Sequence, residues 1–585
     1  MSLEPNEQSI PAANLSEDER FEQAVAKSRK ALELAASQPD AYVNIASHLP
    51  IIAQEQPYQK AVVVPAGRMP DGKAAYAHLT FKQLNDEADR IAHGLHSIGI
   101  GEGTKTILMV KPSLELFSLT FALFKVGATF IMIDPGMGVK RMVHCLKETQ
   151  AEAFIGIPLA HVVRKVFPSA FRSVKKVVTV GKRLFWGGPT LEELKNVGTG
   201  PFETAKVKRT DMAAILFTTG STGPAKGVVY QHGTFDAQVH YLRSHFRIRP
   251  GEVDLATFPL FALFGPALGM TAVIPDMDPR YPAKVDPVKL IETIEDHGCT
   301  TMFGSPALLN RVGRYAKANN IKLPSFRRVI SAGAPVPHAV LDLFGELLNE
   351  GVEIHTPYGA TESLPTASIG SKEILGDTRE LSASGKGICV GQPMKYFNLR
   401  VIKISDDPIE NWSDDLLVPA GEIGEIVVKG PTVTKSYFNK PDANAGAKIK
   451  DGDEVCHRMG DVGWLDDKGR VWFCGRKKHR VITADGPMFT VPCEAIFNQH
   501  PRVYRSALVG QGKAPNQTPA IIVELEAGDN GRDKAGLTKE LLDMAQKHEH
   551  TAPIKKVLFH ESLPVDIRHN AKIFREKLTV WAANK

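Results

Sequence analysis

Between residues 79 and 360, short apolar runs alternate with longer stretches in which apolar residues recur at helical spacing. The short runs have the length of buried strands, and the stretches between them are long enough for amphipathic helices. The runs that we predict as strands are 106–110, 127–133, 152–157, 176–180, 212–216, 300–304, 328–331 and 352–356. Because strands that alternate with helices form parallel sheets covered on both faces, this region predicts an α/β domain.

The pattern changes after Gly391, where shorter β-rich pieces at 399–404, 424–429 and 463–473 are separated by turns. They predict a small β-barrel subdomain. A charged break at 475–480 then leads into about a hundred residues that mix strands with helices, a size suited to a small α+β domain. We therefore predict a large N-terminal domain of mostly parallel, helix-covered sheets with a small barrel, hinged to an α+β C-terminal domain.

The boundaries follow from the same pattern. Residues 1–40 start polar and continue as a charged helix with sparse apolar positions, so they are predicted as an N-terminal extension. Whether this extension docks on a partner or on its own chain stays open. Residues 41–475 form the predicted N-terminal domain, 476–480 the hinge and 481–585 the C-terminal lid domain.

Composition narrows the class of protein. The 585 residues are 43% hydrophobic and 23% charged, which is typical of globular proteins, and the net charge of +6 is too modest to indicate nucleic-acid binding. Six dispersed cysteines and an acidic start without a signal-peptide pattern favour the reducing cytoplasm. The most apolar stretch, 253–275, is interrupted by proline and glycine, so we expect a buried pocket-lining segment rather than a membrane span.

Residues 217–227 form a loop directly after the predicted strand 212–216, with three glycines, four hydroxyl side chains and Lys226. Such a loop can turn backbone N–H groups toward a polyphosphate, because glycine allows close backbone approach. A plain surface turn is the alternative. A Walker A loop is excluded, because Gly227 rather than serine or threonine follows the lysine.

Two more polar loops follow predicted strands, at Gly333-Ala334-Pro335 and at 357–362. Ligands bind in such sheets at the carboxyl ends of the strands. Three loops in that position therefore predict a nucleotide site.

With two later motifs, His457–Asp461 and Asn570–Ile573, the chain resembles the adenylate-forming superfamily of acyl-CoA synthetases, adenylation domains and luciferases. The resemblance extends from about residue 45 to 580 and lies in five motifs in the right order. It implies that a carboxylate attacks the α-phosphate of ATP, with Mg²⁺, to give an acyl-adenylate and pyrophosphate. Cations and aligned donors must then offset the repulsion between two anions.

The resemblance also implies roles for single residues. Lys572, Thr361 and Glu362 would be catalytic, Glu362 would bind the metal, and Lys478 would be the hinge residue. ATP contacts would come from Thr218, Thr219, Gly220, Ser221, Thr222, Gly223, Lys226, Gly333, Ala334, Pro335, Tyr358, Gly359, Asp461 and Arg476.

Departures from the family pattern concern the acid. Ala262 stands where a histidine is common, so we expect it to open space beside the substrate carboxylate, in a wall with Phe261, Phe264 and Gly265. Residues 485–494 are longer than usual on the side that serves the thioester step in CoA ligases. Dependence on CoA is therefore in doubt.

These departures resemble the β-lactone synthetases of bacterial long-chain olefin biosynthesis. That resemblance implies a long-chain 2-alkyl-3-hydroxy acid whose own hydroxyl displaces AMP, and assembly with other enzymes of the same pathway. His232 and His569 are candidates to take the hydroxyl proton. A long-chain acyl-CoA ligase is the nearest alternative, a non-catalytic sensor is a more distant one, and transient contact with a membrane surface stays open.

Overall fold

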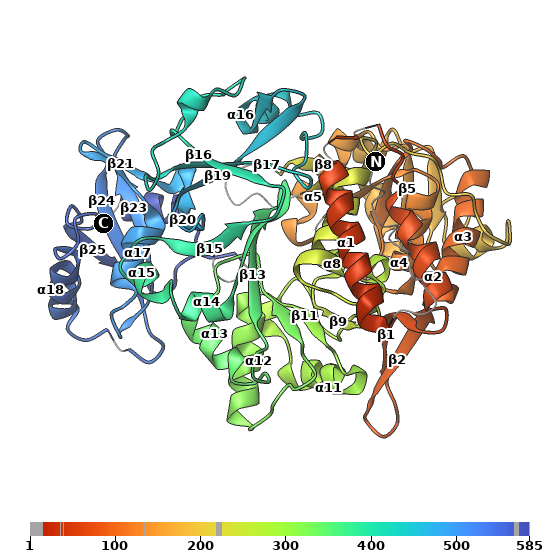
Figure 1. Ribbon diagram of the computed structural model, residues 1–585, viewed down its shortest axis with the longest axis horizontal. Helices are drawn as coiled ribbons and strands as arrows, with labels where there is room; N and C mark the ends of the chain where they lie inside the picture. The colour runs from red at the N-terminus through yellow and green to blue at the C-terminus, as the bar shows by residue number, and fades with distance from the viewer. Residues whose placement is uncertain are drawn as a thin grey trace, which may run out of the picture.

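Two large sheets organise the protein (Figure 1). The structure, a computed structural model, describes residues 16–585 except 36, 39, 134, 218–224, 530, 567–571 and 584. Within that part, the strands pair into sheets of six, fourteen, three and two strands. The two larger sheets are built before residue 477 and the two smaller ones after it.

The six-stranded sheet has the order β6-β5-β3-β4-β7-β8, and all its pairs are parallel except β7–β8. Its strands are β3 (Lys105–Met109), β4 (Thr129–Ile133), β5 (Ala153–Gly156), β6 (Lys176–Thr179), β7 (Met212–Phe217) and β8 (Gly227–Gln231). The first five confirm the strands predicted from the apolar runs. Of these five, β7 ends at the predicted phosphate loop.

Helices α3 (Phe81–Ser97) and α4 (Leu114–Lys125) pack against each other beside this sheet. Every residue of α4 from Leu116 to Lys125 is buried, as expected for a helix that is apolar on all sides. Lys125 is buried too, and its ammonium donates hydrogen bonds to Asp89 and, over 2.8 Å, to Asn85 of α3. These hydrogen bonds offset the free-energy cost of burying a charged lysine at the end of the helix.

The fourteen-stranded sheet begins with a parallel half. Its strands are β1 (Lys60–Arg68), β9 (Val253–Ala256), β10 (Thr271–Val273), β11 (Thr301–Phe303), β12 (Arg328–Ile330) and β13 (Ile354–Ala360), with β2 (Ala74–Thr80) antiparallel at the edge. The α/β fold class predicted from the sequence is confirmed.

An antiparallel half continues the same sheet. It holds β14 (Ser363–Gly370), β15 (Ile388–Pro393), β16 (Asn398–Ile402), β17 (Gly424–Lys429), β18 (Lys448–Asp451), β19 (Glu454–Leu465) and β20 (Val471–Arg476). Among the described residues, their pairings run in an open path from β15 to β16.

The β-rich piece predicted at 463–473 contains the end of β19 and the start of β20, which form a hairpin there. The side chain of Asp466 accepts hydrogen bonds from the backbone N–H groups of Lys468 (3.0 Å) and Arg470 (2.8 Å) and so folds the turn. Gly469 supplies a positive φ of 74°. The turn thus divides the β-rich piece into two paired strands.

The remaining helices cover the sheets. Before residue 477 they are α2 (His48–Glu55), α5 (Val139–Thr149), α6 (Pro158–Val166), α7 (Leu191–Lys195), α8 (His232–His245), α9 (Pro259–Ala262), α10 (Phe264–Leu268), α11 (Pro287–His297), α12 (Pro306–Ala318), α13 (His338–Gly345), α14 (Ser371–Leu375), α15 (Arg379–Ala383) and α16 (Pro441–Ala447). The most apolar stretch becomes β9, α9, α10 and β10. No described helix is long and apolar enough to cross a membrane.

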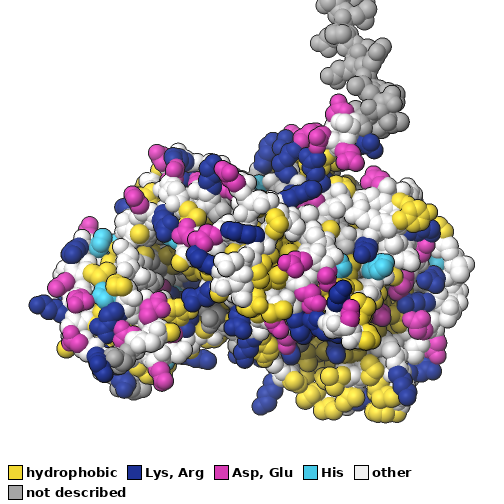
Figure 2. All heavy atoms as spheres, turned by 90° about the horizontal axis from the view of Figure 1, so that it is seen from below, with side chains coloured by type: hydrophobic (Ala, Val, Ile, Leu, Met, Phe, Trp, Pro, Cys, Tyr) yellow, Lys and Arg dark blue, Asp and Glu magenta, His cyan; other side chains and the backbone are white. Residues whose placement is uncertain are grey.

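The C-terminal part is α+β. It contains β21 (Val481–Thr483), β22 (Gly486–Met488), α17 (Thr490–Phe497), β23 (Val503–Gln511), β24 (Thr518–Leu525), α18 (Lys534–Ala545), β25 (Lys556–Phe559) and α19 (Arg575–Ala582). It lies at the left of Figure 1, and Figure 2 shows a hollow between it and the rest of the molecule.

Helix α1 (Glu17–Ala35) docks on its own chain, along α8 (Figure 1). The ring of Phe21 lies 5.1 Å from the guanidinium of Arg247 and 4.6 Å from that of Arg249. Leu32 is buried against Tyr241 of α8. The question that the sequence left open, whether this helix docks on a partner or on its own chain, is therefore answered for residues 17–35.

Candidate active site

One large cavity, of about 2530 Å³, is lined by residues of both large sheets and of the C-terminal part. Ordinary small-molecule pockets enclose about 300–1,000 Å³, so this one has room for more than one ligand group. Polar side chains line one end and aromatic and aliphatic side chains another. Most of the predicted site residues that the structure describes lie on its wall.

A carboxylate shared by three strands forms the first part of the polar end. Asp461 of β19 accepts a hydrogen bond from the hydroxyl of Tyr358 of β13 over 2.6 Å, and Arg476 of β20 lies 2.9 Å from its Oδ1. Asp461 and Arg476 are register partners in the β19–β20 hairpin. Burial raises the pKa of Asp461, and the charges of Arg476 and Lys572 oppose that rise.

This cluster leaves one acceptor open. Oδ1 of Asp461 is buried but has no hydrogen-bond partner of suitable geometry among the described residues, although the Arg476 charge lies nearby. A buried acceptor without a donor is costly unless a ligand supplies one. The hydroxyls of a ribose are such donors, so the predicted nucleotide role of Asp461 fits its environment.

Two glycines determine the backbone conformation of the cavity wall beside the Asp461 cluster. Gly333, with a φ of +94°, opens the loop after β12, and it lines the cavity together with Ala334 and Pro335. At Gly359 in β13, a Cβ would come within 2.4 Å of the Ser363 carbonyl oxygen, so no other residue fits there without a shift. Glycine at this position therefore allows the close approach of β13 and β14, whose register shifts between Tyr358 and Ala360.

Glu362 lies in the turn between β13 and β14 and accepts a hydrogen bond from the hydroxyl of Tyr437 over 2.7 Å. The ammonium of Lys226 lies 4.6 Å from the centre of the Tyr437 ring. Burial lowers the pKa of Lys226, the charge of Glu362 opposes this change and the charge of Lys478 adds to it. An anion placed among these groups would restore the lysine charge.

Sequence reasoning missed Tyr437 and Lys448 in this region. Lys448 of β18 is buried, donates to the backbone oxygen of Thr434 and lies 5.7 Å from the Tyr437 ring. Burial lowers its pKa to about 7. Neither residue belongs to a glycine-rich motif, and only their position before the predicted ribose motif could have drawn attention to them.

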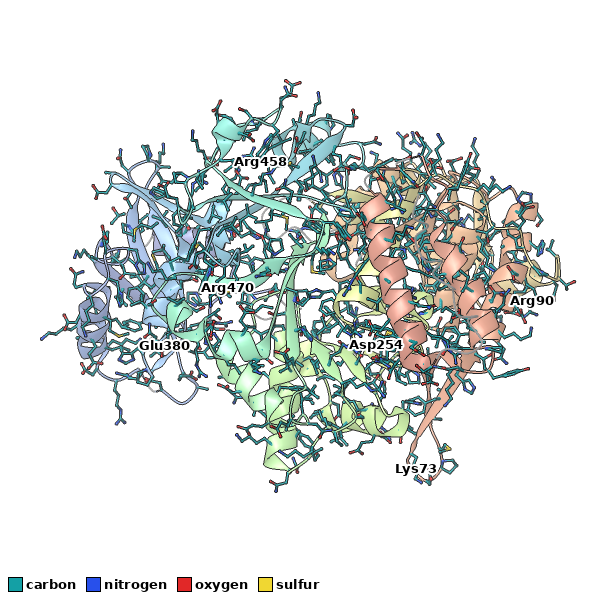
Figure 3. The ribbon with its side chains drawn as sticks, in the orientation of Figure 1. Lys73, Arg90, Asp254, Glu380, Arg458 and Arg470 are labelled. Atoms are coloured by element: carbon teal, nitrogen blue, oxygen red, sulfur yellow. The ribbon has the colours of Figure 1, made fainter. Side chains whose placement is uncertain are left out.

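A second buried charge cluster lies at the approach to the hinge. Arg458 of β19, labelled in Figure 3, donates to Glu425 of β17 over 3.0 and 2.7 Å, and Lys477 lies 3.0 Å from the same carboxylate. Arg458 stands in the predicted ribose motif but serves this ion pair. Through Glu425, the cluster fastens Lys477, the residue after β20, to the N-terminal part.

The C-terminal part brings Lys572 to the cavity. Lys572 lines the wall, and its backbone N–H donates to Oδ1 of Asp566 over 2.8 Å. The charge of Lys572 acts to lower the pKa of Asp461 in the N-terminal part, and the charge of Lys478 acts to lower the pKa of Lys226. The predicted catalytic lysine and the predicted hinge lysine thus lie within electrostatic reach of two predicted nucleotide-binding residues.

Part of the predicted site lies outside the described residues. This holds for Thr218, Thr219, Gly220, Ser221, Thr222 and Gly223 of the predicted phosphate loop, and for His569. His232, the other candidate to take a proton, is buried and is not on the cavity wall. Burial lowers its pKa to about 4, and its Nδ1 accepts from the N–H of Ile45.

The apolar end of the cavity differs from the substrate wall that we expected from the sequence. Phe261 and Phe264 line the cavity, and the Phe261 ring lies 4.4 Å from that of Phe303. Ala262 and Gly265 do not line it, since both are buried behind the aromatic wall and Ala262 is wholly inaccessible. The small residue at 262 therefore meets the protein core and not the substrate, because a short helical turn, α9, points it inward.

One group among the described residues has the donors of a transition-metal site, namely His48, Asp236 and His240. It lies outside the cavity lining, and Arg209 occupies the second oxygen of Asp236 at 3.0 Å. Magnesium prefers oxygen ligands, so this group is not the expected Mg²⁺ site. It is an ion-pair cluster that holds α2 against α8.

Residues 52–438 match the family described as AMP-binding enzyme, and the chain belongs to that family. It is 48% identical over 549 residues to the olefin beta-lactone synthetase of Xanthomonas campestris pv. campestris, covering 93% of this chain and 98% of the relative. It is 49% identical over 549 residues to the protein of the same name from Stenotrophomonas maltophilia, covering 92% and 98%. Among solved structures, the anthranilate CoA ligase AuaEII with anthranoyl-AMP is similar in fold, with a TM-score of 0.74 at 20% identity, covering 94% of this chain and 99% of the ligase.

The shared carboxylate yields a first prediction. Asp461→Asn removes the charge that faces Arg476 and weakens the acceptor for a ribose hydroxyl. Hydrogen bonds to charged groups contribute about 1.5–3 kcal/mol, so we expect ATP to bind roughly 10- to 100-fold more weakly. Isothermal titration calorimetry with ATP measures this. Tyr358→Phe, which keeps the ring and loses a single hydrogen bond, should cost less, and an equal loss in both variants would contradict this ranking.

The position of Ala262 yields a second prediction. Ala262→His forces a larger polar ring into a filled core, and overpacking costs about 1–3 kcal/mol. We expect a lower free energy of unfolding in denaturant titrations, and equal losses of activity with branched and straight-chain acids. Unchanged stability together with a selective loss of branched acids would instead place residue 262 at the substrate.

Proposed function

We propose that this protein is an ATP-dependent β-lactone synthetase, which adenylates a long-chain 2-alkyl-3-hydroxy acid and then closes it to a β-lactone. The observation that carries the proposal is the single cavity that joins the Asp461 cluster, Lys572 and an aromatic wall. Two relatives that match nearly all of the chain are named olefin beta-lactone synthetase. The family membership supports the AMP-forming step.

In the first step, a carboxylate oxygen of the acid bonds to the α-phosphorus of ATP, and the bond from that phosphorus to the bridging oxygen breaks to release pyrophosphate. Both partners are anions, so cations must lie between them. Lys572 and Lys226 line the cavity at its polar end. We assign Lys572 to the carboxylate and α-phosphate, and Lys226 to the terminal phosphates.

Glu362 is the residue that would hold Mg²⁺. Its carboxylate supplies the hard oxygen ligand that this ion prefers, and Tyr437 fixes one of its oxygens at 2.7 Å. The ion, when bound, neutralises phosphate charge during transfer. Thr361 is held beside it, because the hydroxyl of Tyr230 donates to its backbone oxygen over 2.6 Å.

In the second step, the 3-hydroxyl oxygen attacks the activated acyl carbon, the bond from that carbon to the phosphate oxygen breaks, and AMP leaves. The hydroxyl proton passes to a base. A well-oriented intramolecular nucleophile gains about 7–11 kcal/mol over a separate one, so no second substrate is needed. The aromatic wall of Phe261, Phe264 and Phe303 would keep water from hydrolysing the adenylate.

A long-chain acyl-CoA ligase would share the first step, and this class is the alternative. The two functions differ only in the group that displaces AMP.

The six cysteines are all buried thiols, which suits a reducing cytoplasm in either case. We place the enzyme there, together with the other enzymes of a pathway that makes its hydroxy acid.

The reaction products give the third prediction. We expect ATP, Mg²⁺ and a 2-alkyl-3-hydroxy fatty acid to yield a β-lactone and AMP in equal amounts without CoA, as measured by mass spectrometry. A matched acid without the 3-hydroxyl should stop at the bound adenylate. A thioester that forms only when CoA is added would make the protein an acyl-CoA ligase.

Lys572 gives the fourth prediction. Lys572→Ala should reduce the rate of adenylation about 100- to 1,000-fold, because one preorganised donor to the developing charge is lost. The binding of ATP should change little. Pyrophosphate release measures the first effect and calorimetry the second. Lys577→Ala, which removes an exposed lysine on nearby α19, is the matched control, and equal rates in both variants would refute the assignment.

A further inference from the structure

Helix α6 presents apolar side chains to solvent. Leu159 is 67% exposed, Val162 37% and Val166 62%. These residues are spaced i, i+3 and i+7, so they share one face of the helix. A surface helix normally turns such a face toward the core. Contiguous exposed apolar side chains mark a surface that binds a protein or a membrane.

A loop beside α6 enlarges this surface. Leu184 is 51% and Phe185 76% exposed. The next residue, Trp186, is buried and stacks on His161 of α6, with ring centres 4.9 Å apart, and its N–H donates to Thr179 over 2.8 Å. This anchor holds the two exposed side chains beside the helix. We call Leu159, Val162, Val166, Leu184 and Phe185 the α6 patch.

Within the segment that carries the α6 patch, the charged side chains are of one sign. Residues 153–191 contain seven lysines and arginines and no aspartate or glutamate. Those that are exposed are Lys165, Arg172, Lys175, Lys182 and Arg183. Arg183 is partly offset by Glu193 at 2.9 Å. In a chain with a net charge of only +6, this segment is basic well beyond the average.

The α6 patch is continuous with the cavity. Leu159 lines the cavity as well as the surface, and so does Val139 of α5, which is 50% exposed. Ala160 and Val163, which lie between the exposed residues of α6, also line it. On the half of the molecule that carries the six-stranded sheet, Figure 2 shows hydrophobic side chains gathered along the lower edge, with Lys and Arg beside them.

We propose that the α6 patch docks on the surface of an anionic lipid membrane. Apolar side chains enter the boundary between headgroups and acyl chains, and lysines and arginines around them bind the negative headgroups. A protein partner would equally cover apolar side chains, but the absence of any carboxylate over 153–191 matches the uniform charge of a lipid surface better. Docking would not depend on the catalysed reaction.

The consequence for the substrate rests on the proposed function. A long-chain acid with two alkyl arms partitions into lipid rather than water. Docking would place the cavity wall formed by Leu159 and Val139 at the membrane surface, so the acid could pass from lipid to enzyme without crossing water. The product, a neutral lactone, could return by the same way.

The fifth prediction tests docking with the full-length protein and vesicles. We expect cosedimentation with vesicles of phosphatidylglycerol and phosphatidylcholine, at least tenfold less with phosphatidylcholine alone, and a marked loss in high salt because screening weakens surface charge. The double variant Phe185→Ser, Val166→Ser should bind the anionic vesicles at least tenfold more weakly. Tyr58→Ser, which changes a side chain that is 85% exposed elsewhere, is the control and should bind as the wild type does.

A second charge variant, Lys165→Glu with Lys182→Glu, keeps the result interpretable if the apolar variant folds poorly, and it should also lose vesicle binding. All variants should adenylate a short, water-soluble acid at the wild-type rate, which separates docking from catalysis. Wild-type protein that ignores anionic vesicles, or patch variants that bind them normally, would overturn the proposal. In the first case the α6 patch would instead be the site of a protein partner.

Discussion

The structure of the polar end depends on one requirement, that the buried carboxylate of Asp461 be compensated. A charge removed from water is stable only with partners close to it. Tyr358 and Arg476 are those partners, and they lie on β13 and β20 while Asp461 lies on β19. The three strands are therefore locked in register at the cavity. Because Arg476 is the last residue of β20, the same contact also fixes the chain where it enters the C-terminal part.

Around this fixed point, the protein gathers more positive charge than it neutralises. Burial lowers the pKa of both Lys226 and Lys448, and each is also lowered by another lysine nearby. Glu362 is the carboxylate that opposes both changes. Such an arrangement is unfavourable in the empty site and becomes favourable when a polyphosphate enters, so binding energy is stored as electrostatic preorganisation. The same argument accounts for Lys572 of the C-terminal part and Lys478 of the hinge, which also line the cavity.

The sequence allowed the parallel sheets to be predicted, because buried strands leave local patterns. It also singled out Lys226, Tyr358 and Asp461, which the structure brings to the wall of one cavity. It failed where a side chain's direction depends on one helical turn. Ala262 was placed beside the substrate, yet α9 turns it into the core. Tyr437 and Lys448 were missed, because their role arises only when β18 lies beside Glu362. The docking of α1 was open, since nothing local tells which surface covers Phe21.

The shape of the cavity also bears on the choice between the two displacement reactions. A tethered hydroxyl arrives with the acid, so the proposed adenylation and ring closure involve atoms that are already inside one cavity. An external thiol would need an additional path to the acyl carbon, and the C-terminal part would have to admit it. Lys572 and Lys478 both line this cavity. In the proposed lactone formation the nucleophile therefore needs no separate path into the cavity, whereas thioester formation would need one.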